Sequence, residues 1–95
     1  MVLGVLKVEL FFAHSNSLKE KRKYLRSIKE KVRNSLNVAV GETDYQDLWQ
    51  RSELSFACIS NDTKNAQEVL QDILNILTKH YPEFVVSFSK EFLSL

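Results

Sequence analysis

Apolar residues recur at every second position along much of the first thirteen residues. They form one continuous apolar face in an extended chain, while Lys7 and Glu9 interrupt the other face. This alternation predicts a strand from Val2 to Ala13. The expected inward residues are Val2, Leu6, Val8, Leu10 and Phe12.

A helical pattern follows the polar turn from His14 to Ser17. The run Ser17-Leu-Lys-Glu20 matches a capping box, in which the serine hydroxyl accepts a hydrogen bond from the backbone of Glu20 and the glutamate reaches back. Apolar residues then recur at helical spacing within one narrow stripe, which is typical of a helix that packs on a sheet. The stripe consists of Leu18, Leu25, Ile28, Val32 and Leu36.

The middle of the chain predicts two strands joined by a short connection. The first runs from Asn37 to Tyr45 with Val38 and Val40 as its core candidates, and residues 46–50 form the connection. The second strand runs from Arg51 to Ser60. Leu54, Phe56 and Cys58 alternate on its inward face.

A second helix and a last strand complete the pattern. Asn61 or Asp62 is the expected helix cap, and Pro82 marks the end because proline cannot continue a helix. The broad apolar arc of the helix contains Ala66, Val69, Leu70, Ile73, Leu74, Ile76 and Leu77, and the last strand alternates Phe84, Val86, Phe88 and Phe92.

The resulting order is strand, helix, strand, strand, helix, strand. Right-handed crossovers place both helices on one face of a four-stranded antiparallel sheet, with the first and third strands central. We therefore expect an α+β, ferredoxin-like βαββαβ fold that forms a single domain over residues 1–95. The other sheet face mixes Lys7, Glu53 and Ser55 with Leu3 and Ile59, so we expect it to face water or a second copy in a homodimer.

Composition narrows the class of protein. The chain is 44% hydrophobic and 26% charged, as globular domains are, and its single cysteine excludes an intramolecular disulfide. No apolar run approaches the ~20 residues of a membrane span. The first residues lack the basic region and cleavage site of a signal peptide. We expect a cytoplasmic protein with no membrane partner.

Positive charge is concentrated on the first helix. Eight of the thirteen basic residues lie between Lys19 and Arg33, against two acidic residues, although the chain carries only +1 overall. Five of them form a row roughly 20 Å long beside the apolar stripe, with Lys23 next to it. Such a row favours contact with a polyanion through its phosphates. The row consists of Lys19, Arg22, Arg26, Lys29 and Arg33.

The start of this helix is an unfavourable place for cations. Lys19, Lys21, Arg22 and Lys23 occupy the first two turns, where the helix dipole is positive and each cation costs about 0.3–1 kcal/mol. An anion docked at this end would explain the arrangement. The alternative is an ordinary solvated face, because lysine and arginine are good helix formers.

Trp49 lies within Asp44-Tyr-Gln-Asp-Leu-Trp-Gln-Arg51, on the connection between the two middle strands. It is a candidate partner contact, together with Arg51, or a platform for an exposed base. We favour another interpretation, in which Trp49 and Leu48 fold back as a cap over the end of the core.

The sequence contains no pattern typical of a catalytic or metal site. His14, His80 and Cys58 are interpreted as structural, and no cluster of His, Cys and carboxylates has ligand spacing. The chain has no glycine-rich phosphate loop. Acylphosphatases are the natural enzyme alternative for this fold, but residues 14–17 contain neither the glycine nor the arginine of their phosphate loop. We expect a protein that is not an enzyme and binds no cofactor or metal.

Three segments resemble the YlxP-like family of small bacterial proteins. They are Ser17-Leu-Lys-Glu-Lys-Arg22, the run from Asn37 to Arg51, and Ser60-Asn-Asp62, and the similarity covers essentially the whole chain. The resemblance implies a ferredoxin-like domain of unknown function for which ribosome association or RNA binding has been proposed. It transfers no catalytic residue. Together with the basic row, it predicts an accessory factor for RNA or a ribosomal subunit, the alternative being an oligomerising or small-molecule-sensing domain.

Overall fold

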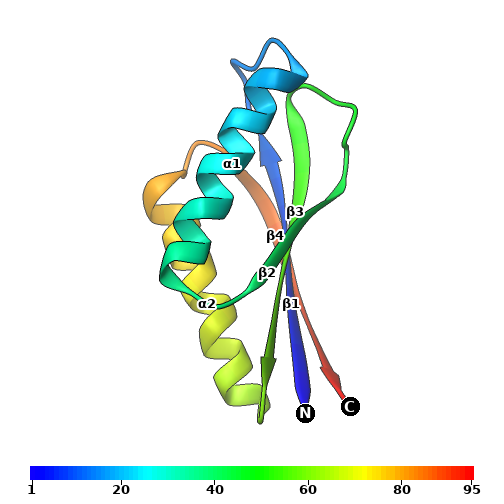
Figure 1. Ribbon diagram of the computed structural model, residues 1–95, viewed down its shortest axis with the longest axis vertical. Coiled ribbons are helices and arrows are strands. Elements are labelled where there is room, and N and C mark those ends of the chain that lie inside the picture. The colour runs from blue at the N-terminus through cyan, green and yellow to red at the C-terminus, as the bar shows by residue number, and fades with distance from the viewer.

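The computed structural model describes residues 1–95 as two helices packed on one face of a four-stranded sheet (Figure 1). The strands lie in the order β2-β3-β1-β4, and all neighbouring strands are antiparallel. The predicted architecture, including its central strands β1 and β3, is confirmed. The elements are β1 (Val2–Phe11), α1 (Leu18–Ser35), β2 (Ala39–Asp44), β3 (Arg51–Ser60), α2 (Thr63–His80) and β4 (Val85–Ser94).

The core lies between the sheet and the two helices. The predicted inward faces of β1 and β3 are all buried, and Leu25, Ile28 and Val32 of α1 pack against them. Leu18 and Leu36, at the two ends of the α1 stripe, are only half-buried because the helix ends there. The fully apolar side of α2 contributes Ala66, Leu70, Ile73, Leu74 and Leu77.

Both helices begin at capped residues. Ser17 Oγ accepts a hydrogen bond from the Glu20 amide at 3.1 Å, as predicted. The reciprocal bond differs, because the Glu20 carboxylate accepts from the Asn16 amide at 3.0 Å rather than from Ser17. Asp62 Oδ1 caps α2 by accepting from the Asn65 amide at 2.7 Å.

The last strand departs from the predicted alternation. Glu9 pairs with Ser87 but Leu10 pairs with Val85, so a bulge falls at Val86. A bulge shifts the residues beyond it relative to the faces of the sheet. Val85 therefore packs against the core and Val86 is exposed, so the predicted alternation breaks at Val86. Phe88 lies opposite the inward-facing Val8 but is still exposed, on a strand at the edge of the sheet.

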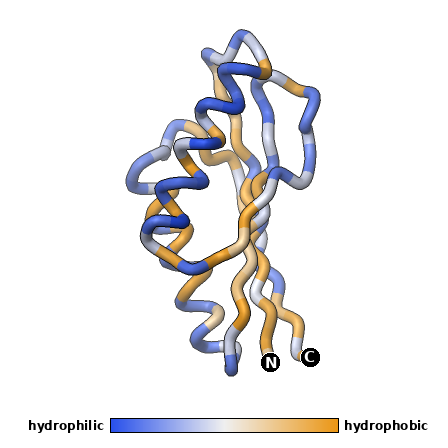
Figure 2. The backbone as a smooth tube through the Cα atoms, in the orientation of Figure 1, coloured by the Kyte–Doolittle hydropathy of each residue, from blue (hydrophilic) through white to orange (hydrophobic).

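Hydropathy differs between α1 and the central strands (Figure 2). Hydrophilic residues dominate α1 and the β2–β3 connection, and hydrophobic residues follow the central strands. Neither helix combines the length and apolar character needed to cross a bilayer.

Candidate functional site

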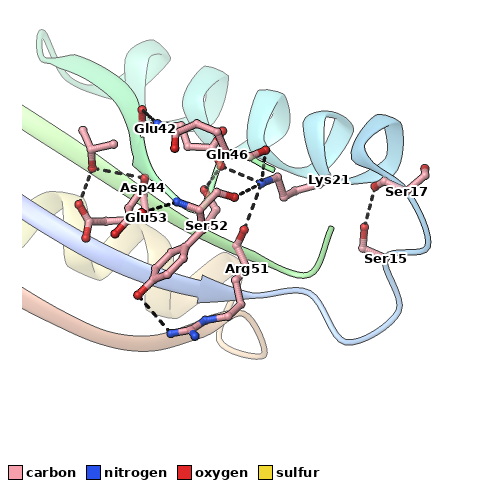
Figure 3. A network of polar contacts seen from close by, with 11 residues as sticks. Ser15, Ser17, Lys21, Glu42, Asp44, Gln46, Arg51, Ser52 and Glu53 are labelled. Carbon is pink, nitrogen blue, oxygen red and sulfur yellow. Dashed lines mark hydrogen bonds and ion pairs between the residues drawn. The ribbon is translucent and has the colours of Figure 1, made fainter. Parts of the chain in front are cut away.

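Lys21 is buried although it lies in the second turn of a charged helix. Its side chain is 1% exposed and runs into the β2–β3 connection (Figure 3). The ammonium nitrogen donates to the carbonyl oxygens of Tyr45 at 2.8 Å, Gln46 at 3.2 Å and Arg51 at 3.1 Å. One side chain of α1 thus holds both ends of this connection.

Glu42 of β2 neutralises the buried ammonium. Its Oε2 lies 3.0 Å from Lys21 Nζ and also accepts a hydrogen bond from Ser52 Oγ at 2.6 Å. The buried charge is therefore both paired and hydrogen-bonded, as burial in a low-dielectric interior requires.

The side chain of Arg51 stabilises the same connection. Its guanidinium lies 4.3 Å from the centre of the Tyr45 ring and forms an ion pair with Glu9. Tyr45 adopts a φ of 62°, a left-handed conformation that residues other than glycine rarely adopt. Tyr45 therefore makes two contacts in this network. Its backbone carbonyl accepts a hydrogen bond from Lys21, and its ring lies against the guanidinium of Arg51.

Gln50 joins the connection to the β1–α1 turn. Its side-chain amide nitrogen, Nε2, donates to the backbone carbonyl oxygens of Ala13 at 3.2 Å and Ser15 at 3.3 Å. The Gln50 carbonyl in turn accepts from the Phe12 amide at 2.7 Å. The two loops at this end of the sheet are therefore held together by hydrogen bonds as well as by Lys21.

The predicted basic row lies on the surface of α1. Lys29 is half-buried, and the other predicted phosphate contacts are exposed: Lys19, Arg22, Lys23, Arg26 and Arg33. Four of the six line one groove of about 310 Å³ beside Leu25, Glu30 and Glu42 of the β2 edge, namely Arg22, Arg26, Lys29 and Arg33. Lys19 does not line it, and Lys23 lines a neighbouring hollow with Arg26 and Lys31.

The exposed charge at the start of α1 is smaller than predicted. Lys21 is one of the predicted unfavourable cations at the start of α1 but does not face solvent. Its burial against Glu42 removes it from the exposed charge and supplies a structural reason for its position. Lys19, Arg22 and Lys23 remain exposed there.

The proposed cap of Trp49 and Leu48 over the core is wrong. Their side chains are 56% and 46% exposed, and with Phe11 they line an open pocket of about 390 Å³. An aromatic cluster fills that end of the core instead. The Phe12 ring stacks 5.3 Å from Tyr24 and meets Phe84 edge-on at 4.8 Å.

The remaining candidates lie apart from this network. His14 and His80 are exposed, and Cys58 is buried on the inward face of β3. Burial raises the pKa of the Cys58 thiol, and a backbone hydrogen bond with Gly4 partly opposes that rise. No three His, Cys, Asp or Glu side chains come close enough together to hold a metal ion.

Sequence reasoning missed Lys21 and Glu42 as partners, although a signal was present. Lys21 precedes Leu25 by four residues and Ile28 by seven, so it continues the buried stripe of α1. Glu42 follows Val40 by two residues and shares its inward face of β2. Opposite charges on two inward faces predict a buried pair only when the two positions are known to meet.

This strand order with two helices on one face defines a ferredoxin-like domain. Among solved structures, a protein of unknown function from Nitrosomonas europaea superposes with a TM-score of 0.60 at 13% identity, covering 100% of this chain and 90% of that one. A putative antibiotic biosynthesis monooxygenase from Chloroflexus aurantiacus gives 0.56 at 9% identity, covering 98% and 94%. At these identities the likeness concerns the fold alone.

The family follows from sequence. Residues 3–90 match the family described as "Protein of unknown function (DUF503)", and the chain belongs to it. The uncharacterized protein YlxP of Bacillus subtilis (strain 168) is 34% identical over 82 residues, which cover 86% of this chain and 88% of that protein. The YlxP-like resemblance is thereby confirmed, and its two main segments supply the two sides of the Lys21 network.

Proposed function

We propose that this domain is a non-enzymatic accessory factor that binds RNA, free or within a ribosomal subunit, through the basic groove of α1. The observation that supports the proposal is the convergence of Arg22, Arg26, Lys29 and Arg33 on one groove. Phosphate contacts from lysine and arginine supply most of the affinity of nucleic-acid binding, and arginine adds bidentate geometry.

The spacing of these four side chains suits an extended polyanion. They follow one another at intervals of four, three and four residues, and so occupy one face of the helix over roughly 16 Å. Of the two acidic residues that line the groove, Glu42 is already paired with Lys21. Glu30 is the one acidic side chain there without an ion pair, so the groove is strongly positive.

The Lys21 network supports the same proposal because it holds the two walls of the groove together. It joins α1 to Glu42 of β2, and Arg33 Nη2 makes a second, longer contact to the Val40 carbonyl at 3.4 Å. Walls that do not have to be ordered on binding lower the entropic cost of recognition.

The test is binding of the intact protein to labelled ribosomal RNA, and its co-sedimentation with purified ribosomal subunits, across a salt series. Four phosphate contacts predict a slope of about −3 for the logarithm of the binding constant against the logarithm of salt concentration. Arg22→Glu/Arg26→Glu should weaken binding at least tenfold and reduce the magnitude of the slope by about two.

The matched control is Lys64→Glu/Lys79→Glu, which changes the net charge equally but alters exposed residues of α2. It should bind like the parent protein. Equal losses for both double variants would show a response to net charge alone and contradict a site on α1. A slope near zero in the salt series would show that the protein makes no phosphate contacts.

The non-enzymatic part of the proposal has its own assay. The loop between β1 and α1 contains Asn16 and Ser17 but no arginine that could contact a phosphate. Its Ser15 is buried, and the Ser15 hydroxyl donates to the Ser17 carbonyl at 3.1 Å. We expect no turnover of an acyl phosphate by the purified protein. Turnover that is saturable would make the chain an enzyme.

A second candidate function is self-association or small-molecule sensing through the open face of the sheet. One end of that face is apolar, because Leu3 pairs with both Ile59 and Leu93, and the latter two are exposed. Sedimentation velocity of nuclease-treated protein tests it, with Ile59→Lys as the disrupting variant. A dimer that Ile59→Lys dissociates and that ignores RNA would favour this function over the first.

A further inference from the structure

A second surface lies at the junction of the β1 end and the β2–β3 connection. Its open pocket of about 390 Å³ is lined by three large apolar side chains, Phe11, Leu48 and Trp49, all of them exposed. Asp47, Gln50 and Arg51 complete the lining. The pocket shares no lining residue with the basic groove of α1.

The unbalanced charge in this pocket is negative. The guanidinium of Arg51 is already occupied by the Glu9 carboxylate and the Tyr45 ring. The carboxylate of Asp47, in contrast, makes no hydrogen bond and no ion pair with any other residue of the chain. A free carboxylate beside exposed aromatic rings is complementary to a cation that carries an apolar or planar body.

The pocket is also formed before any ligand arrives. Lys21 holds the carbonyls of Tyr45, Gln46 and Arg51, so the backbone on both sides of Trp49 is anchored. Gln50, next to Trp49, is tied to the β1–α1 turn. Anchored exposed aromatic residues bind at low entropic cost, which is why they are enriched in protein interfaces.

We propose that this pocket binds an arginine side chain of a protein partner. The guanidinium stacks on the Trp49 ring and pairs with the Asp47 carboxylate, while its aliphatic stem lies against Leu48 and Phe11. Lysine fits less well because its compact ammonium cannot stack on the indole. A phosphate backbone is disfavoured, since Asp47 would repel it, so this site is independent of RNA binding by α1.

Trp49 is the only tryptophan of the chain, so its fluorescence reports directly on the pocket. The intact protein is titrated with the peptide acetyl-Gly-Arg-Gly-Arg-Gly-amide and with matched peptides carrying lysine or citrulline in place of arginine. We expect saturable quenching by the arginine peptide. Citrulline, which keeps the shape but not the charge, should bind at least fivefold more weakly, with lysine intermediate.

Asp47→Asn should weaken the arginine peptide about fivefold and leave the citrulline peptide unchanged. Asp72→Asn, an exposed substitution on α2, is the matched control and should change neither. Because the Asp47 side chain makes no hydrogen bond and no ion pair within the chain, circular dichroism should show that Asp47→Asn folds normally. Equal binding of all three peptides, or no quenching by any of them, would overturn the proposal.

Two further results would also overturn the proposal, because each would assign the pocket to another occupant. Stronger quenching by an oligouridylate than by the arginine peptide would assign the pocket to a nucleic-acid base. An emission change that depends on the concentration of the protein alone would assign it to a second copy. Neither outcome bears on Arg22→Glu/Arg26→Glu, so failure here is distinguishable from failure of the proposed function.

Discussion

The ammonium nitrogen of Lys21 lies 3.0 Å from Oε2 of Glu42 and joins α1 to the edge strand β2. The lysine side chain is 1% exposed and the glutamate 18%, so the pair occupies positions at which this fold would otherwise place apolar residues. Three carbonyl oxygens of the β2–β3 connection share the same ammonium. Lys21 therefore anchors the β2–β3 connection through hydrogen bonds, which an apolar side chain at this position could not form.

Removal of Lys21 should strongly destabilise the protein. Lys21→Met leaves Glu42 without its cation and three carbonyls without their donor, and loss of one partner of a buried pair typically costs about 3–5 kcal/mol. Urea unfolding measures this as a lower midpoint. Lys23→Met, two residues along the same helix but exposed, should change the free energy of unfolding by less than about 0.5 kcal/mol.

The double variant Lys21→Met/Glu42→Leu separates charge pairing from loop anchoring. It removes the uncompensated carboxylate, so it should regain part of the lost stability, while the carbonyls remain without a donor. A loss below about 1 kcal/mol for Lys21→Met alone would contradict a structural role for the pair.

The two glycines should respond oppositely to alanine. A Cβ at Gly4 would lie 3.2 Å from Cys58 Sγ and 3.3 Å from the Ala66 Cβ, in a packed core that cannot move away cheaply, whereas a Cβ at Gly41 meets nothing within 4 Å. We expect Gly4→Ala to cost about 1–3 kcal/mol. Gly41→Ala should be neutral or stabilise by about 0.5 kcal/mol. Thermal unfolding of both variants measures the difference, and equal midpoints would contradict it.

Tyr45 should invert the usual order of alanine and glycine. At its φ of 62° a Cβ is unfavourable, so Tyr45→Gly is expected to be about 1 kcal/mol more stable than Tyr45→Ala. Both variants lose the ring beneath Arg51 equally, so their difference isolates the backbone. Chemical unfolding of the pair measures this difference, and a more stable alanine variant would show that the turn relaxes without its tyrosine.

Cys58 should be unreactive in the folded protein and should make stability fall in alkali. Burial raises the pKa of its thiol above the ordinary value of 9.0, so the unfolded chain loses this proton first as the pH rises. The folded state then binds more protons, and its free energy of unfolding declines above that ordinary pKa. Urea unfolding at about pH 8 and about pH 10 should show a larger decline for the parent protein than for Cys58→Ala. An equal decline in both would assign the effect to other groups.

Iodoacetamide gives a second readout of the same site. Alkylation of Cys58 should be slow in native buffer and fast in urea, because the thiolate is the nucleophile and the folded thiol is both protonated and covered. Rapid native alkylation would show that this end of β3 opens readily.

Periodicity along the chain was sufficient for the elements and for most of the core. The alternation from Val2 to Phe12 and from Leu54 to Cys58 identified the buried faces of the central strands, because these faces form one core with the helices. It failed at β4, where the bulge at Val86 arises from pairing with β1 and leaves no mark in the local pattern.

Some features of the candidate site likewise follow from the sequence, and others depend on the tertiary structure. The row of cations on α1 is a property of one helix, so its residues and their common face follow from the sequence and the helical repeat alone. The burial of Lys21, the groove shared with β2 and the exposure of Trp49 depend on contacts between different elements of the fold, such as that of Lys21 with Glu42 of β2. Only the packing of α1 against the β2 edge, with the aromatic cluster around Phe12 already filling the end of the core, decided them.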